Sequence, residues 1–151
     1  MKPMSKSTQN LRYFALTANL SLILWVGLWQ STISPHPHLN NFILAGVWVL
    51  PMLLPLKGIL QGKPYTHAWA NFILMLYFLH ALTILWVDDG ERLLAMVELG
   101  LASSAFVANI LFARNRGREL GNKLKKLSQV EKEERAAHEE KTTSKTEKPN
   151  R

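Results

Sequence analysis

Glu98 and His80 are the residues of this sequence best suited to proton chemistry, being the only acid and the only histidine in its long apolar stretches. An ionisable side chain in hydrocarbon is costly and marks a functional site by default. Carboxylates and imidazoles are also the usual proton carriers inside membranes. If the two stretches are helices joined by the short turn at 88–92, both side chains lie ~9–11 Å below one surface. A hydrogen bond or ion pair between them is therefore geometrically available.

Two roles are open to this pair. It could relay protons, or it could be a static polar clamp that sets the register of two helices, worth roughly 0.5–2 kcal/mol. We favour the clamp, because one pair at one depth does not make a pathway across the membrane.

Asn19, Asn71 and Asn109 lie in other parts of the apolar stretches and predict an inward-facing polar stripe. Ordinary packing of membrane helices uses such a stripe as well.

We expect no catalytic residue, metal site or cofactor, and no enzymatic activity. The chain has no cysteine, which excludes thiolate nucleophiles and iron–sulfur ligation. It also lacks a glycine-rich phosphate loop, a nucleophile elbow and a His-Glu-x-x-His motif. His36 and His38 lie in a loop without acids or cysteines, and His67 lies in another loop, so we interpret all three as solvated.

Four apolar stretches must position the polar side chains, at about 13–33, 41–60, 68–87 and 93–113. Each is close to the ~20 residues that a helix needs to cross ~30 Å of hydrocarbon. Backbone polar groups cannot stay unpaired in lipid, so these stretches should be helices. The sequence predicts an all-α fold, an integral membrane bundle of four transmembrane helices.

The distribution of positive charge predicts the orientation of the bundle. Of the 18 Lys and Arg, all but Arg92 lie before the first stretch, in the segment 57–67 that ends the second stretch and leads to the third, or after the fourth. This is the positive-inside pattern, so residues 1–12, the loop at 57–67 and the C-terminus should be cytoplasmic. We interpret the first stretch as an uncleaved anchor, because Ser31–Ser34 is a poor cleavage site; cleavage would leave three spans in the same orientation.

Three features inside the stretches concern helix shape, helix packing and anchoring. Pro51 and Pro55 share one face of the second helix and predict a kink. In the fourth stretch, three small residues have the spacing that allows close helix packing: Gly100, Ser104 and Ala108. They indicate that this helix is either the packing centre of the bundle or a homo-oligomer interface. The aromatic residues near the predicted interfaces suit membrane anchoring, namely Trp25, Trp29, Trp86, Tyr13, Tyr65 and Trp69.

The polar C-terminal part predicts a basic cytoplasmic helix over 114–140 and a disordered tail over 141–151. Its first part carries six basic residues that we expect to face anionic inner-leaflet lipid: Arg114, Arg116, Arg118, Lys123, Lys125 and Lys126. No aromatic residues are interleaved with them, so nucleic acid is not an expected partner.

Several short motifs resemble a family of small predicted inner-membrane proteins of proteobacteria, domain of unknown function 2069. They are the Pro…Leu-x-Gly run at 51–58, Tyr-Thr-x-x-Trp at 65–69, Tyr-Phe-x-His at 77–80 and the helix of Glu98 that ends in Phe-Ala-Arg at 112–114. The likeness covers roughly residues 10–115. It implies a multi-pass protein of the bacterial inner membrane and supplies no activity. It draws attention to Tyr65, Trp69, His80 and Glu98; Pro64 stands where the family often has a basic residue.

The sequence leaves two functions open. We favour a non-enzymatic accessory or scaffold protein that binds partner helices or anionic lipid through the fourth helix and the tail. The alternative is a small proton-linked transporter, in which Glu98 carries the proton and His80 tunes it. A chain with four spans would have to form a homo-oligomer to enclose a path.

Overall fold

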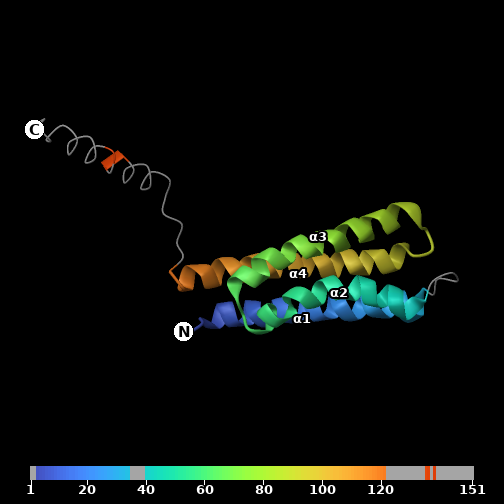
Figure 1. Ribbon diagram of the computed structural model, residues 1–151, viewed down its shortest axis with the longest axis horizontal. Coiled ribbons are helices and arrows are strands. Elements are labelled where there is room, and N and C mark those ends of the chain that lie inside the picture. The colour runs from blue at the N-terminus through green and yellow to red at the C-terminus, as the bar shows by residue number, and fades with distance from the viewer. Residues whose placement is uncertain (1–2, 35–39, 122–134, 137, 139–151) are drawn as a thin grey trace, which may run out of the picture. The chain divides into compact units, whose positions relative to one another are not determined.

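Four long helices form the first of the two units into which the chain divides, residues 1–121 and 122–151. The structure is a computed structural model that describes residues 3–34, 40–121, 135, 136 and 138. The helices are α1 (Lys6–Leu28), α2 (Asn41–Leu60), α3 (Pro64–Val87) and α4 (Arg92–Glu119), and η1 (Trp29–Ile33) extends α1 by a π-helical turn (Figure 1). Each is long and apolar enough to cross a bilayer. The prediction of an all-α bundle with four transmembrane helices is confirmed.

Capping residues set most of the helix ends. The side chains of Ser5 and Asn40 accept hydrogen bonds from backbone N–H groups in the first turns of α1 and α2. Pro64 opens α3, where its fixed φ suits a helix and its missing N–H costs nothing. Gly62 and Gly121 have φ angles of 67° and 89°, which glycine adopts most easily, and they lie just beyond the ends of α2 and α4.

Three of the four helices extend beyond the apolar stretches that predict them, whereas α2 coincides with its stretch, 41–60. α1 begins at Lys6 rather than at 13, and α3 begins at Pro64 rather than at 68. α4 continues to Glu119, so the first residues of the predicted basic helix, 114–119, continue the fourth helix. Hydropathy marks the part of a helix suited to hydrocarbon, whereas caps and glycines mark where the helix ends. Most of the predicted tail, including 141–151, lies outside the described residues.

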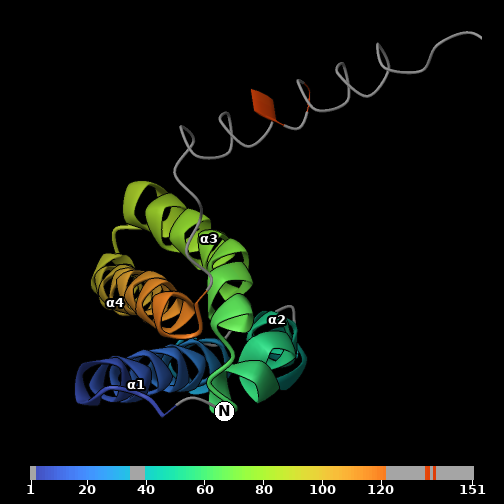
Figure 2. The same ribbon diagram turned by 90° about the vertical axis from the view of Figure 1, so that its left-hand side faces the viewer.

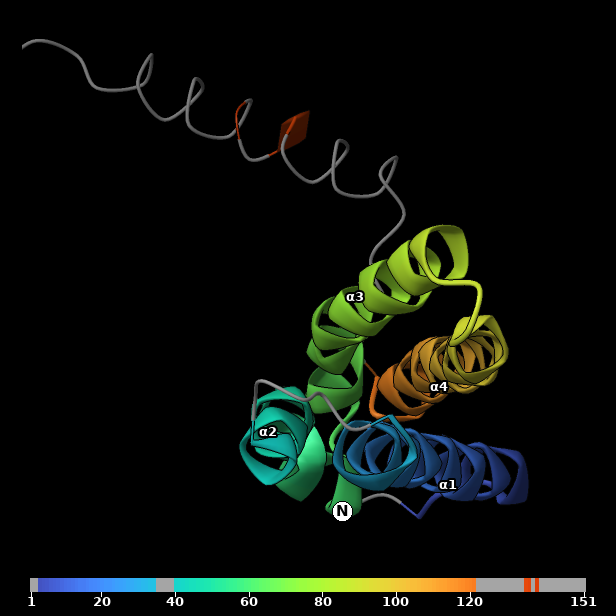
Figure 3. The same cartoon turned by 90° about the vertical axis from the view of Figure 1, so that its right-hand side faces the viewer.

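α4 lies between α1 and α3 and makes its most extensive contacts with these two helices (Figures 2 and 3). α2 packs against α1, η1 and α3. The buried core lies where these helices face one another, and its members are Ala18, Leu22, Val26, Met52, Leu74, Tyr77, Ala102 and Ala105. The small alanines of α4 allow the helix backbones to approach closely.

Large apolar side chains cover the outer surface of the bundle. Phe42, Phe72 and Trp86 are 77%, 77% and 90% exposed, and they belong to α2 and α3. Such side chains are suited to contact with lipid tails, which are as apolar as the protein core. The polar side chains described below lie inside this apolar shell or at one end of it.

Candidate functional site

The side chains of His80 and Glu98 meet inside the bundle, near the turn between α3 and α4. His80 Nδ1 lies 2.7 Å from Glu98 Oε2. The Glu98 side chain is fully buried, and that of His80 is 12% exposed. The short turn places the two helices side by side in opposite directions, so residues at equal depth come into contact. The structure thus brings together the two residues that the sequence singles out.

Two tryptophans enclose the His80 ring. The Trp48 ring of α2 lies 4.2 Å from it, and the Trp29 ring of η1 lies 5.2 Å from it, between centroids. Tyr77 donates a hydrogen bond of 2.5 Å to the Trp48 carbonyl and so fixes α2 against α3. Trp29 is only 1% exposed, so its interpretation as an interface anchor is wrong. In the sequence, the only indication of these contacts is that aromatic residues occur at a predicted depth similar to that of His80.

One oxygen of the buried carboxylate lacks a partner. Glu98 Oε1 is inaccessible and accepts no hydrogen bond from any residue that the structure describes. A buried polar atom without a hydrogen bond costs about 1–3 kcal/mol, and more where the group is charged.

Asn109 of α4 is the centre of a second buried group, which we call the amide cluster: Asn19, Asn71, Asn109 and His67. Asn109 Oδ1 accepts a hydrogen bond of 3.1 Å from Asn19 Nδ2 of α1. Asn109 Nδ2 donates to Asn71 Oδ1 of α3, also at 3.1 Å. His67 Nδ1 lies 2.8 Å from Asn109 Oδ1. The three asparagines predicted as a polar stripe thus join three helices at one level.

His67 does not lie in a loop, and it is not solvated as the sequence suggested. It belongs to the first turn of α3 and is fully buried, with its ring centroid 4.3 Å from that of Phe112 in α4. The prediction is wrong because α3 begins before its apolar stretch, which turns residue 67 toward α4.

Apolar side chains separate the amide cluster from the His80–Glu98 pair. Along α4, Ala105 and Ala102 lie between Asn109 and Glu98, and both are fully buried. Leu22 of α1 and Leu74 of α3 are buried in the same part of the core. Asn109 lies eleven positions after Glu98 in the same helix, so the two residues are ~16 Å apart along the helix axis. The two polar groups are therefore separate features of the bundle.

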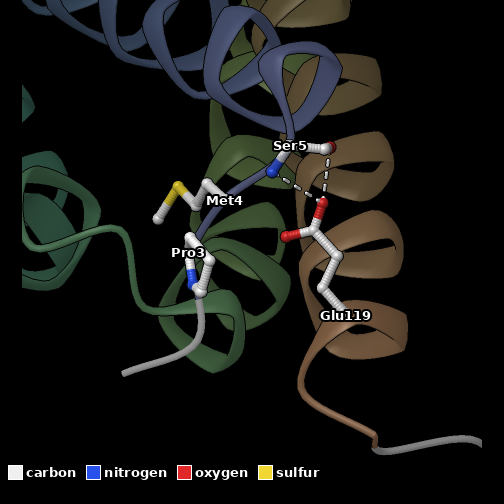
Figure 4. A pocket seen from close by; sticks show the side chains of 4 residues that line it. All are labelled: Pro3, Met4, Ser5 and Glu119. Atoms are coloured by element: carbon white, nitrogen blue, oxygen red, sulfur yellow. Dashed lines mark hydrogen bonds between the residues drawn. The ribbon is translucent and has the colours of Figure 1, made fainter.

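A third polar group joins the start of α1 to the end of α4, and we call it the terminal clasp: Ser5, Thr8, Arg116 and Glu119. Glu119 Oε1 accepts hydrogen bonds of 2.6 Å from the hydroxyls of both Ser5 and Thr8. Its Oε2 lies 3.0 Å from Arg116 Nη1. Figure 4 shows the Ser5–Glu119 contact beside Pro3 and Met4.

The basic residues after the fourth apolar stretch do not all face outward. Arg114 and Arg118 are exposed, as expected of residues that meet lipid headgroups. Arg116 is only 4% exposed, and its guanidinium also lies 3.5 Å from the Pro3 carbonyl. The prediction that Arg116 lies on the outer surface beside these two residues is wrong, because α4 continues as a helix and turns this position toward α1, where it lines a cavity instead. Lys123, Lys125 and Lys126 lie outside the described residues, as do His36 and His38.

The predicted small-residue face of α4 is mostly turned away from the bundle. Gly100 is exposed, and no atom outside its own helix lies within 4 Å of where a Cβ would stand. Ser104 donates to the Gly100 carbonyl at 2.8 Å, and only Ala108 is fully buried. α4 itself makes the most extensive helix contacts, as expected of the packing centre of the bundle, but it does so largely through other residues. A homo-oligomer interface on this face stays a prediction.

The remaining residues noted in the sequence belong to α2 and α3. Pro51 and Pro55 lie within α2, which continues to Leu60, and Pro55 is buried. The predicted kink stays a prediction. Tyr65 is 79% exposed, and Trp69 is partly buried, in the first turns of α3.

Comparison with known proteins agrees with this fold. Residues 14–117 match the model of the predicted membrane proteins classed as domain of unknown function 2069. The chain belongs to this family. The family is described as membrane proteins, which agrees with the four apolar helices, and its description assigns no activity. No curated protein and no solved structure matches the chain.

Proposed function

We propose that this member of the family is a non-enzymatic accessory or scaffold protein of the bacterial inner membrane, which binds partner helices or anionic lipid. The observation that supports this role is the separation of the two interior polar groups by buried apolar side chains. Each group joins neighbouring helices through hydrogen bonds, as a structural clamp does. In this proposal, the polar groups inside the bundle stabilise its fold, and the outer faces of the helices bind the partner helices or the lipid.

The exposed face around Gly100 suits a partner helix. Because Gly100 has open space beside it, another helix can approach α4 closely there. The basic end of the bundle, where α1 begins and α4 ends, suits anionic lipid through the exposed Arg114 and Arg118. These two surfaces use different residues, so substitutions can test them separately.

Mild detergent extraction of the tagged protein from its native membrane, followed by mass spectrometry, tests this function. A membrane partner in stoichiometric amount is the expected result. Gly100→Leu should abolish its retention if the partner uses the exposed face of α4. Val47→Leu is the matched control, because Val47 is an exposed residue that is already apolar and belongs to α2 rather than to the face around Gly100. Recovery of the chain as a homo-oligomer alone would contradict the binding of partner helices, which is the strongest form of the proposal.

A second candidate is proton-linked transport by a homo-oligomer, and the unpartnered Oε1 of buried Glu98 favours it. Such a carboxylate could take up and release a proton, with His80 as its partner. If the pair is a clamp, Glu98→Gln should lower the free energy of unfolding by roughly 0.5–2 kcal/mol. If the protein is a transporter, the same variant should keep its melting temperature and lose proton uptake in proteoliposomes. Glu91→Gln, outside the bundle interior, is the control for both measurements.

A further inference from the structure

A cavity of about 470 Å³ opens at the turn between α2 and α3. It is lined by residues from three parts of the chain: Met4, Gln61–Pro64, Arg116 and Leu120. Met4 also borders a neighbouring hollow of about 430 Å³, which Pro3, Ser5 and Glu119 complete (Figure 4). The segment before α1, the α2–α3 turn and the end of α4 therefore share one concave region.

Positive charge predominates at this cavity. Lys63 is an exposed part of its lining, and Arg116 is a buried part, held by the Glu119 carboxylate. Behind the turn, Arg12 Nη2 donates a hydrogen bond of 2.7 Å to the Leu60 carbonyl. Glu119 is the one acid in the described parts of the chain at this end, and the terminal clasp occupies its oxygens. The cavity thus presents a net positive field to an incoming group.

The rest of the lining is largely apolar. Met4, Pro64 and Leu120 supply hydrocarbon surface beside the two cations. A phospholipid has the matching chemistry, because its phosphate suits Lys and Arg and its glycerol and upper acyl carbons suit an apolar wall. Soluble phosphate would gain nothing from that wall.

We propose that this cavity binds the headgroup phosphate of an anionic phospholipid, with Lys63 and Arg116 as its cationic partners. The proposal names the lipid site within the proposed function and rests on it. Arg116 is fixed in place by the Glu119 carboxylate and the Pro3 carbonyl, so its guanidinium is in position before the lipid arrives. Lys63 lies at the exposed side and can move onto the phosphate.

Lipid binding to the full-length protein in a neutral detergent tests the site, with phosphatidylglycerol and phosphatidylcholine as probes and native mass spectrometry as the readout. Wild type should retain phosphatidylglycerol in preference to phosphatidylcholine. Lys63→Glu should weaken phosphatidylglycerol binding at least about fivefold, since the loss of one basic residue near a headgroup costs ~1 kcal/mol and the new acid repels the phosphate. Lys57→Glu is the matched control, being an exposed lysine in the last turn of α2 outside the cavity lining, and should weaken binding less than about twofold.

A second variant keeps the test independent of folding. Gln61→Glu adds an acid to the cavity lining at an exposed position and should weaken binding as Lys63→Glu does, with an unchanged melting temperature. Equal losses for Lys63→Glu and Lys57→Glu would mean diffuse attraction and overturn the proposal. Binding of inorganic phosphate alone, with the same dependence on Lys63, would overturn the lipid as ligand. Because the assay uses the isolated protein, failure to find a membrane partner leaves its result unaffected.

Discussion

Among single residues, Asn109 has the widest set of partners in the amide cluster. Its side chain contacts one residue of α1 and two of α3, and it is fully buried. Asn71, by comparison, contacts Asn109 and reaches the Phe106 carbonyl at 3.4 Å, both in α4. Substitution at the two positions should therefore have unequal effects.

Asn109→Ala should lower the free energy of unfolding by about 2–4 kcal/mol, because it leaves several buried polar groups unpaired at ~1–3 kcal/mol each. Asn71→Ala should cost about 1 kcal/mol, since it removes one good hydrogen bond. Thermal unfolding in detergent at constant lipid content measures both. An equal or greater loss for Asn71→Ala would contradict the central position of Asn109.

At the level of helix pairs, α2 and α3 lie close together where Gly58 faces Thr66. A Cβ placed on Gly58 would lie less than 3.0 Å from atoms of the Thr66 side chain. Real Cβ contacts are essentially never so short, so Gly58 permits this approach of the two helices. The glycine belongs to the Leu-x-Gly motif, and the contact gives that motif a physical reason.

Gly58→Ala should destabilise the bundle by about 1–3 kcal/mol through overpacking. Gly100→Ala should be neutral or slightly stabilising, because nothing lies within 4 Å of the added carbon. The two melting temperatures in detergent make the comparison. Adding Thr66→Ala to Gly58→Ala should recover part of the loss, and no recovery would rule out Thr66 as the obstacle.

The terminal clasp joins the first turn of α1 to the last turn of α4. Glu119→Ala removes the acceptor of the Ser5 and Thr8 hydroxyls, so amide protons of residues 6–10 and 116–120 should exchange faster with solvent. Exchange in the middle of α3 should stay unchanged. Hydrogen exchange followed by mass spectrometry measures both regions. Unchanged protection of the first turn of α1 would show that the clasp does not hold that turn in place.

At the scale of the whole bundle, the positive charge lies at one end. The start of α1, the α2–α3 turn and the end of α4 all meet at that end (Figure 1). They carry every Lys and Arg of the described bundle except Arg92. The other end carries Asp88, Asp89 and Glu91. This asymmetry predicts that the basic end faces the cytoplasm.

Single cysteines test this orientation cleanly, because the chain has none of its own. In intact spheroplasts, a membrane-impermeant maleimide should label Asp89→Cys and should not label Lys63→Cys. After permeabilisation, it should label both, since both positions are exposed. The reverse pattern would place the termini outside, and labelling of both in intact cells would indicate mixed orientation.

Much of the architecture could be predicted from the sequence, because lipid restricts what a chain can do. Segments of this length and hydropathy have to become helices, so four spans follow directly. The contact of His80 with Glu98 could also be predicted, because the short turn expected at 88–92 makes the third and fourth helices antiparallel neighbours and places the two residues at a similar depth. The positions of the three asparagines indicated a polar stripe, but they could not show which side chains form hydrogen bonds with one another.

Only the tertiary structure decided which side of each helix is buried. Gly100 faces out, Arg116 and His67 face in, and Trp29 packs on His80. In a soluble protein, a polar outer face reveals the buried one, but in a membrane helix the lipid-facing side is as apolar as the core. Small residues occur on several sides of α4, so their spacing alone could not distinguish the packed side. Helix contacts resolve that ambiguity, and they exist only once the bundle has formed.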